Sequence, residues 1–196
     1  MRTFVAFLAT ALVALAQTPA TTPPADLASN PASATPTIKP DLPTIFIAGD
    51  STAARGRGDP QQGWGVPFAD YFDLEKVNVV NRARGGRSSR TFVNEGLWDQ
   101  MLADVKKGDT VLIQFGHNDG GSIDARPQRG SIPGLGEETQ QVTNLTTNQP
   151  ETVHTFGWYV RKMIADVKAK GANPIVLSLT ERNIWRDGRI ERGSGR

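Results

Sequence analysis

A short apolar segment that stops at a polar turn restricts the fold of this chain more than any other feature. Residues 44–48 read Thr-Ile-Phe-Ile-Ala and are followed at once by Gly49, Asp50 and Ser51. An apolar run of this length, bounded by a turn signal, predicts a buried strand. In an open parallel α/β sheet, the Ser51 hydroxyl would then lie at the carboxyl end of the strands, where ligands bind. A simpler interpretation is also open, in which Asp50 or Ser51 only caps a following helix.

Strand-like and helix-like segments alternate after this turn. Further apolar runs predict strands at residues 77–81, 110–115 and 174–179. Apolar side chains at helical spacing predict helices that begin at Pro67 and span 97–105 and 160–167, with Phe68, Tyr71 and Phe72 facing the sheet. Residues 122–154 predict a long surface excursion. This alternation predicts the α/β class, with a doubly wound parallel sheet and right-handed crossovers that put helices on both faces.

The predicted strand order brings two polar residues together. In a flavodoxin-like order, the first and third strands are neighbours across the point where the connections reverse direction. Ser51 follows the first strand, and Asn118 follows the third. We therefore expect Ser51 and Asn118 to lie on facing sides of one crevice.

The first part of the chain resembles an export signal followed by a linker. Residues 1–16 have a short basic start, an apolar stretch and the small-x-small sequence Ala14-Leu15-Ala16. This pattern predicts a signal peptide cleaved after Ala16 and a secreted or periplasmic protein; an uncleaved membrane anchor is the alternative. Residues 17–42 are rich in Pro, Ala and Thr and predict a disordered linker. The folded domain is then expected over residues 43–196.

Composition excludes several kinds of site and partner. The chain has no cysteine, which rules out disulfides and thiolate metal sites. Its 22 Lys and Arg against 20 Asp and Glu leave a net charge of +2, too small to argue for nucleic acid or a membrane surface. We therefore expect no nucleic acid and no membrane among the partners, and a monomeric protein.

The residues at the predicted strand ends suit ester chemistry. Cleavage through a serine requires a hydroxyl, a base that takes its proton, a group that orients the base, and donors for the oxyanion. Ser51 supplies a hydroxyl. The candidate oxyanion donors are the N–H groups of Ser51 and Gly86 and the side-chain amide of Asn118.

Three segments resemble the first three sequence blocks of the SGNH/GDSL hydrolases: Gly49-Asp50-Ser51, the run Gly85–Arg90 that contains Gly86, and Gly116-His117-Asn118-Asp119. Together with Gly63-Trp64-Gly65, they look most similar to the rhamnogalacturonan acetylesterase branch, over about residues 43–183. The resemblance implies a three-layer α/β/α sandwich, with Ser51 as the nucleophile and Gly86 and Asn118 completing the oxyanion hole. It also implies removal of acetyl groups from a pectic polysaccharide, without a metal or other cofactor.

One part of the family pattern is missing. The family carries its catalytic Asp and His as Asp-x-x-His after a further strand, and this sequence has no such run. Its histidines are His117, which we expect to support its loop, and His154, which we expect at the surface or packed in a loop. We expect a C-terminally incomplete domain that lacks its last strand and helix, which would leave the fourth strand as an apolar edge.

Arginines gather in the same loops, at positions 55, 57, 82, 84, 87 and 90. Because the guanidinium fork suits carboxylates, Arg87 and Arg90 are candidates for binding an acidic polysaccharide such as pectin. The alternative is that these arginines bond loop carbonyls and the nearby acids Asp50, Asp59 and Asp119.

The function favoured by the sequence is a serine esterase that deacetylates a plant cell-wall polysaccharide, most simply rhamnogalacturonan. Two other functions stay open. One is a catalytically silent polysaccharide-binding domain that uses the arginine-lined cleft. The other is a lipase or thioesterase of the same superfamily, because acyl preference resides in loops that the sequence blocks do not specify.

Overall fold

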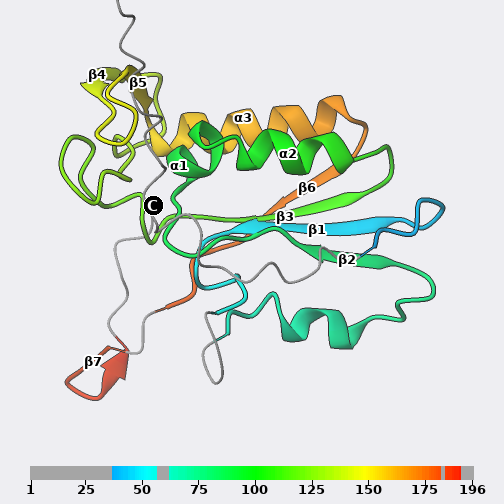
Figure 1. The fold of residues 1–196 in the computed structure, drawn as a ribbon. Helices are drawn as coiled ribbons and strands as arrows, with labels where there is room; N and C mark the ends of the chain where they lie inside the picture. Colours follow the sequence, from blue (N-terminus) through cyan, green and yellow to red (C-terminus); the bar gives the residue numbers. More distant parts are fainter. Residues whose placement is uncertain (1–36, 57–61, 182–183, 191–196) are drawn as a thin grey trace, which may run out of the picture. The chain divides into compact units, whose positions relative to one another are not determined.

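A parallel sheet forms the centre of the domain (Figure 1). The computed structural model describes residues 37–56, 62–181 and 184–190, so the expected signal peptide and most of the expected linker lie outside the described residues. The four strands of this sheet are β1 (Thr44–Gly49), β2 (Asn78–Asn81), β3 (Thr110–Gln114) and β6 (Asn173–Val176). All four predicted strands are confirmed, although β6 ends three residues earlier than expected.

The sheet has the order β2-β1-β3-β6, and each neighbouring pair is parallel. This is the flavodoxin-like order that the sequence predicts. The connection from β1 to β2 runs toward one edge of the sheet. The connections from β2 to β3 and from β3 to β6 run toward the other edge. Since parallel crossovers are right-handed, connections that run in opposite directions place their helices on opposite faces of the sheet. The predicted doubly wound α/β architecture is therefore confirmed.

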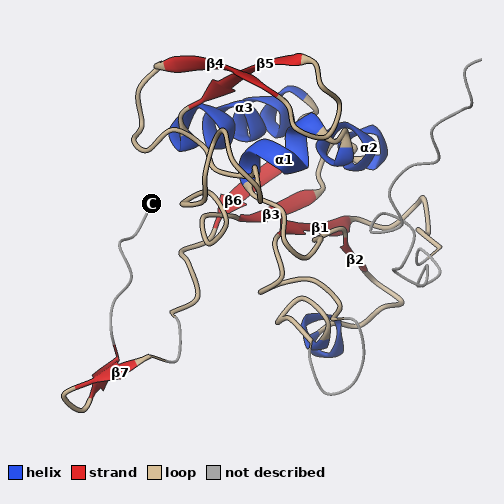
Figure 2. Ribbon diagram, turned by 60° about the vertical axis from the view of Figure 1, so that its left-hand side comes forward, coloured by secondary structure: helices blue, strands red, loops and turns tan. Residues whose placement is uncertain are grey.

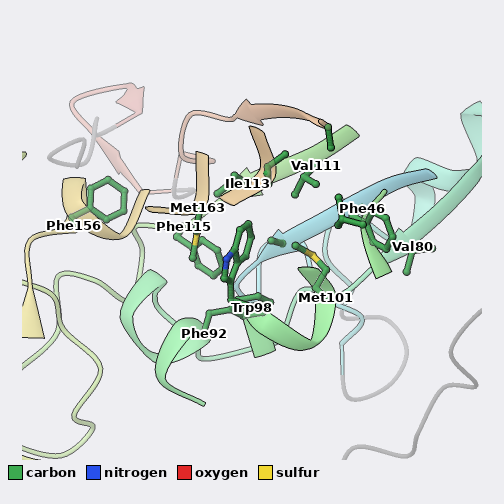
Figure 3. Packing of buried hydrophobic residues seen from close by; sticks show 14 residues of the cluster. Phe46, Val80, Phe92, Trp98, Met101, Val111, Ile113, Phe115, Phe156 and Met163 are labelled. Carbon is green, nitrogen blue, oxygen red and sulfur yellow. The ribbon is translucent and has the colours of Figure 1, made fainter. Parts of the chain in front are cut away.

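One face of the sheet is covered by three helices (Figure 2). They are α1 (Ser89–Asn94), α2 (Leu97–Asp104) and α3 (Phe156–Ala169). Phe46 and Ala48 of β1 point toward these helices, and Ile47 between them points away, as the alternation of a strand requires. The main core lies in this layer, where Trp98 of α2 and Met163 of α3 are fully buried (Figure 3).

The other face is covered by a short 3-10 helix, η2 (Pro67–Tyr71), and the loop before it. Trp64 and Phe68 pack here against Ile47 and Leu112, with the Trp64 and Phe68 rings edge to face. The prediction that Tyr71 faces the sheet is wrong, because its side chain is 83% exposed. The helix ends at Tyr71 and the backbone of Phe72 is already extended, so η2 is too short to turn all three aromatic rings inward.

Some elements were not predicted. Helix α1 begins at a capping box formed by Ser88 and Thr91, and its six residues are too few to give a periodic pattern. Within the expected surface excursion, β4 (Thr139–Thr143) and β5 (Pro150–His154) form an antiparallel hairpin of mostly polar residues. A second small hairpin joins β7 (Trp185–Arg186) to β8 (Arg189–Ile190).

The domain also begins earlier than the expected boundary at residue 43. Ile38 packs against the main core, and the backbone N–H of Lys39 donates to Asn78 Oδ1 at 3.0 Å.

At the opposite side of the sheet, β6 is an edge strand in the described part of the chain, and Ile175 and Val176 are each nearly half exposed. None of the described helices combines the length and the hydrophobicity needed to cross a bilayer.

Candidate active site

Ser51 lies in a turn directly after β1, at the carboxyl edge of the sheet. Asp50 is fully buried, and its Oδ1 accepts hydrogen bonds from the N–H and the hydroxyl of Thr52, both at 2.8 Å. The Asp50 carboxylate therefore holds the turn. It does not cap a helix, because the residues that follow Ser51 form a turn. Ser51 is exposed, and no hydrogen bond joins its hydroxyl to another described residue. The turn thus presents Ser51 Oγ to the solvent.

The Gly63-Trp64-Gly65 segment is hydrogen-bonded to this turn through its backbone. The N–H of Gly63 donates to the Ala54 carbonyl at 2.8 Å, and the N–H of Trp64 donates to the Thr52 carbonyl at 2.9 Å. A Cβ on Gly63 would lie 2.5 Å from the Thr52 carbonyl oxygen. Only glycine permits this close approach of two backbones, which explains why the two glycines flank the tryptophan.

Gln114 is a site-supporting residue that the sequence did not identify. It is the last residue of β3 and pairs with Gly49 across the sheet. Its Oε1 accepts from Trp64 Nε1 at 2.6 Å and from Thr52 Oγ1 at 3.1 Å, while its Nε2 donates to the Ser178 carbonyl at 2.7 Å. One buried amide therefore joins the Ser51 turn to the segment that follows β6. In the sequence, the signal for this supporting role is that Gln114 is a polar residue at the end of an otherwise apolar strand.

Gly86 lies in a tight turn after β2. The N–H of Arg87 donates to the Arg84 carbonyl at 3.4 Å, and Gly86 has a φ of +77°. A positive φ at the third position of a turn is the conformation that favours glycine. A Cβ built on the preceding Gly85 would lie 3.8 Å from Ser51 Cβ, so the two turns are in contact. Neither the Ser51 N–H nor the Gly86 N–H donates to a described residue.

Asn118 follows β3 and is 8% exposed. Its Nδ2 donates to the Arg87 carbonyl at 2.8 Å, which ties it to the Gly86 turn. The amide carries two N–H donors, so this bond leaves one for a ligand. A pocket of about 330 Å³ is lined by Ser51, Thr52, His117, Asn118, Thr180 and Glu181. The predicted crevice between Ser51 and Asn118 is therefore present, with the Gly86 turn next to it.

Asp119 connects the loop after β3 to the start of α1. It is fully buried and accepts hydrogen bonds from the Ser89 N–H, the Ser89 hydroxyl and the Ser131 hydroxyl. Burial raises the pKa of Asp119, the hydrogen bonds from Ser89 and Ser131 oppose this rise, and the nearby charge of Asp50 adds to it. This carboxyl group fixes the start of α1 against the loop that carries Asn118.

The two histidines differ in position. His117 lines the pocket with Ser51, but its Nε2 is buried and has no hydrogen-bond partner in the described structure. His154 lies at the end of β5, where its ring stacks on Trp158 at 3.7 Å between centroids. Burial lowers the pKa of His154. The packing role expected for His154 agrees with this stacking.

Most of the described arginines of the predicted cluster form ion pairs. Arg82 pairs with Asp104, Arg87 with Glu95 and Arg90 with Glu151. The Arg87 side chain, 23% exposed, also donates to the Gly85 carbonyl at 3.2 Å.

Arg90 is 1% exposed, and its Nη1 donates to the carbonyls of Ile123 and Gly130. The expectation that Arg90 binds substrate is therefore corrected, because its side chain is buried and its Nε and Nη1 are bonded inside the protein. Arg57 lies outside the described residues.

A comparison with family models decides which family this site represents. The model of GDSL-like lipases and acylhydrolases matches residues 45–191, a span that includes the Ser51, Gly86 and Asn118 turns. The chain belongs to the GDSL-like lipase/acylhydrolase family. The resemblance predicted from the three sequence blocks is confirmed.

Two curated proteins are similar in sequence to the chain. A rhamnogalacturonan acetylesterase of Emericella nidulans is 41% identical over 146 residues, which are 74% of this chain and 56% of that protein. The rhamnogalacturonan acetylesterase RhgT of Bacillus subtilis is 33% identical over 154 residues, which are 77% of this chain and 55% of that protein. The chain thus spans about half the length of these relatives.

Among solved structures, the crystal structure of YxiM from Bacillus subtilis matches with a TM-score of 0.50 and 28% identity. The match covers 69% of this chain and 32% of that chain. It agrees with the parallel α/β sheet described above.

Proposed function

We propose that this protein is a serine esterase that removes acetyl groups from a plant cell-wall polysaccharide, with rhamnogalacturonan as its substrate. The observation that carries this proposal is the exposed Ser51 hydroxyl in one pocket with the Asn118 amide, next to the N–H groups of Ser51 and Gly86. None of the described residues accepts a hydrogen bond from the Ser51 hydroxyl or from these two N–H groups. The relatives named rhamnogalacturonan acetylesterases support the choice of acyl group and polymer.

The reaction is acyl transfer through an acetyl-enzyme. Ser51 Oγ attacks the acetyl carbonyl carbon while a base takes its proton, and the carbonyl oxygen becomes an oxyanion. The N–H groups of Ser51 and Gly86 and the free N–H of Asn118 then donate to that oxyanion. The tetrahedral intermediate collapses and releases the sugar hydroxyl, and water hydrolyses the acetyl-enzyme to acetate. In the family pattern the base is the His of Asp-x-x-His, a run that residues 1–196 do not contain.

The substrate is tested by measuring acetate release with protein expressed from the complete gene. We expect kcat/KM to be highest on acetylated rhamnogalacturonan and lower on acetylated xylan and on a short-chain triacylglycerol. Preference for the triacylglycerol would favour the lipase alternative. Retarded migration in a pectin-containing native gel without any acetate release would favour the silent binding domain.

Asn118→Ala tests the oxyanion site. Removing one oxyanion donor is expected to lower kcat by about 10²–10³-fold, with a smaller change in KM, because the donor acts mainly in the transition state. Steady-state kinetics on an acetyl ester measure this effect, and thermal unfolding shows whether the Arg87 contact also matters for stability. Asn173→Ala, an exposed asparagine on β6, is the matched control and should keep the wild-type kcat. An unchanged kcat in Asn118→Ala would remove Asn118 from the mechanism.

Two further expectations also stay proposals. Arg87 keeps part of its side chain exposed and is a candidate for contact with an acidic polymer.

Export of the protein, with cleavage after Ala16, is supported by the sequence pattern of residues 1–16. N-terminal sequencing of the mature protein should then begin at Gln17, and a mature protein that begins at Met1 would contradict cleavage.

A further inference from the structure

Arg129 lies beside the Gly86 turn, although it comes from the excursion between β3 and β4. The backbone N–H of Arg129 donates to the Ser122 carbonyl at 3.1 Å, which fixes the residue in its loop. Its Nη1 approaches the Gly86 carbonyl at 3.4 Å, and a Cβ on Gly86 would lie 3.8 Å from the same Nη1. The Arg129 guanidinium therefore borders the turn whose other glycine, Gly85, faces Ser51, since a Cβ on Gly85 would lie 3.8 Å from Ser51 Cβ.

No acidic side chain within the described ranges forms an ion pair with Arg129. Arg82, Arg87 and Arg90, which also lie near the pocket and α1, each pair with an acid. Arg55 and Arg84 share with Arg129 the lack of an ion pair to a described residue. The Nε of Arg129 is buried without a hydrogen-bond partner, and the bond from Nη1 to Gly86 is long. Nη2 has no hydrogen bond to a described residue and is not among the fully buried polar atoms, so it keeps some contact with solvent.

Holding the Arg129 guanidinium in this position costs free energy unless an anion binds to it. A guanidinium has five N–H donors in a rigid fork, and Arg129 uses one of them weakly. A partly buried cation with unused donors loses hydration without gaining a partner. A carboxylate is the anion that the planar fork matches best, because it can accept two parallel N–H bonds.

We propose that Arg129 binds the carboxylate of a uronic acid residue in the polymer, next to the acetyl group held at Ser51. The identity of the polymer rests on the proposed function. The Gly85–Gly86 turn separates the two sites and carries no side chain that would block a polysaccharide lying across it. Arg129, not Arg90, then selects an acidic polymer over a neutral one.

The test measures binding of trigalacturonate and of the same oligomer with its carboxyl groups reduced to alcohols. These ligands carry no acetyl group, so the measurement is independent of catalysis. We expect wild-type protein to bind trigalacturonate more tightly than the neutral oligomer. Arg129→Gln should weaken trigalacturonate binding about ten- to hundredfold, without changing the affinity for the neutral oligomer. Arg129→Lys should give an intermediate affinity, because the lysine keeps the charge but not the fork.

Arg126→Gln is the matched control, since Arg126 is an exposed arginine of the same loop whose Nη2 donates to the Leu145 carbonyl. It should bind trigalacturonate like the wild type, and thermal unfolding of each variant shows whether it is folded. Equal binding of trigalacturonate by wild type and folded Arg129→Gln would overturn the inference, as would an equal loss for both oligomers. Loss of selective binding in Arg129→Gln together with absent acetate release in the wild type would keep the inference and reject the proposed esterase function.

Discussion

Replacing Ser51 with alanine is expected to lower the rate of acetate release by about 10⁶-fold, because the reaction loses its nucleophile. Enzymes of this mechanistic type that lose their serine keep a residual acceleration of about 10³–10⁴ over water, from substrate binding and the oxyanion hole. We therefore expect Ser51→Ala to bind acetylated rhamnogalacturonan with unchanged affinity. Acetate release and ligand binding, measured on the same preparation, give the two values.

The control for this substitution is Ser178→Ala. Ser178 is exposed and follows β6, and its backbone carbonyl, which accepts from Gln114, is retained in the variant. Its acetate release should equal that of the wild type. Wild-type activity in Ser51→Ala would reject serine catalysis at this position, whatever the remaining residues do.

Replacing Arg90 with methionine is expected to destabilise the protein by about 3–5 kcal/mol, because it leaves a mostly buried carboxylate without its cation. Arg90 Nε and Glu151 Oε1 are 2.5 Å apart, and the two side chains are 1% and 12% exposed. The Ile123 and Gly130 carbonyls would lose their donor as well. Urea unfolding gives the change in the free energy of unfolding.

Two comparisons check this explanation. Arg161→Met breaks an ion pair whose side chains are 45% and 73% exposed, and should cost at most about 1 kcal/mol. In Arg90→Met combined with Glu151→Leu, neither charge is left unpaired, so the cost should be less than the sum of the two single substitutions. A fully additive double variant would contradict the buried pair.

The same pair has a pH dependence. Burial opposes ionisation of Glu151, but the hydrogen bond and charge of Arg90, together with hydrogen bonds from Asn144 and Asn94, outweigh it and lower the pKa of Glu151 below its usual value of 4.5. A carboxyl whose pKa is lower in the folded state stabilises the protein above the unfolded pKa, and this contribution is lost as the pH falls through the folded pKa. The difference in stability between the wild type and Arg90→Met should therefore shrink below pH 4.5.

The sheet and the pocket could be predicted because their signals are local in the sequence. The runs that form β1 and β3 are continuous and apolar, since parallel strands are buried on both faces. The polar residues that end these runs then share one edge of the sheet, which places Ser51 and Asn118 in one pocket.

The roles of Arg90 and Arg129 could not be predicted, because they depend on partners far along the chain. Arg90 meets Glu151 at a separation of 61 residues, and Arg129 meets Gly86 at a separation of 43 residues. A run of arginines beside a glycine turn indicates a cationic loop, but it cannot distinguish a buried structural arginine from one that is open to a ligand. The polar β4–β5 hairpin lacked the apolar alternation that marks a half-buried strand.

The most direct test of the central claim is a crystal structure of the protein from the complete gene after reaction with a serine-reactive organophosphate. We expect phosphorus bonded to Ser51 Oγ, with the phosphoryl oxygen about 2.7–3.1 Å from both the Gly86 nitrogen and Asn118 Nδ2. An adduct on another residue, or a phosphoryl oxygen beyond hydrogen-bond distance of these two donors, would contradict the proposed active site.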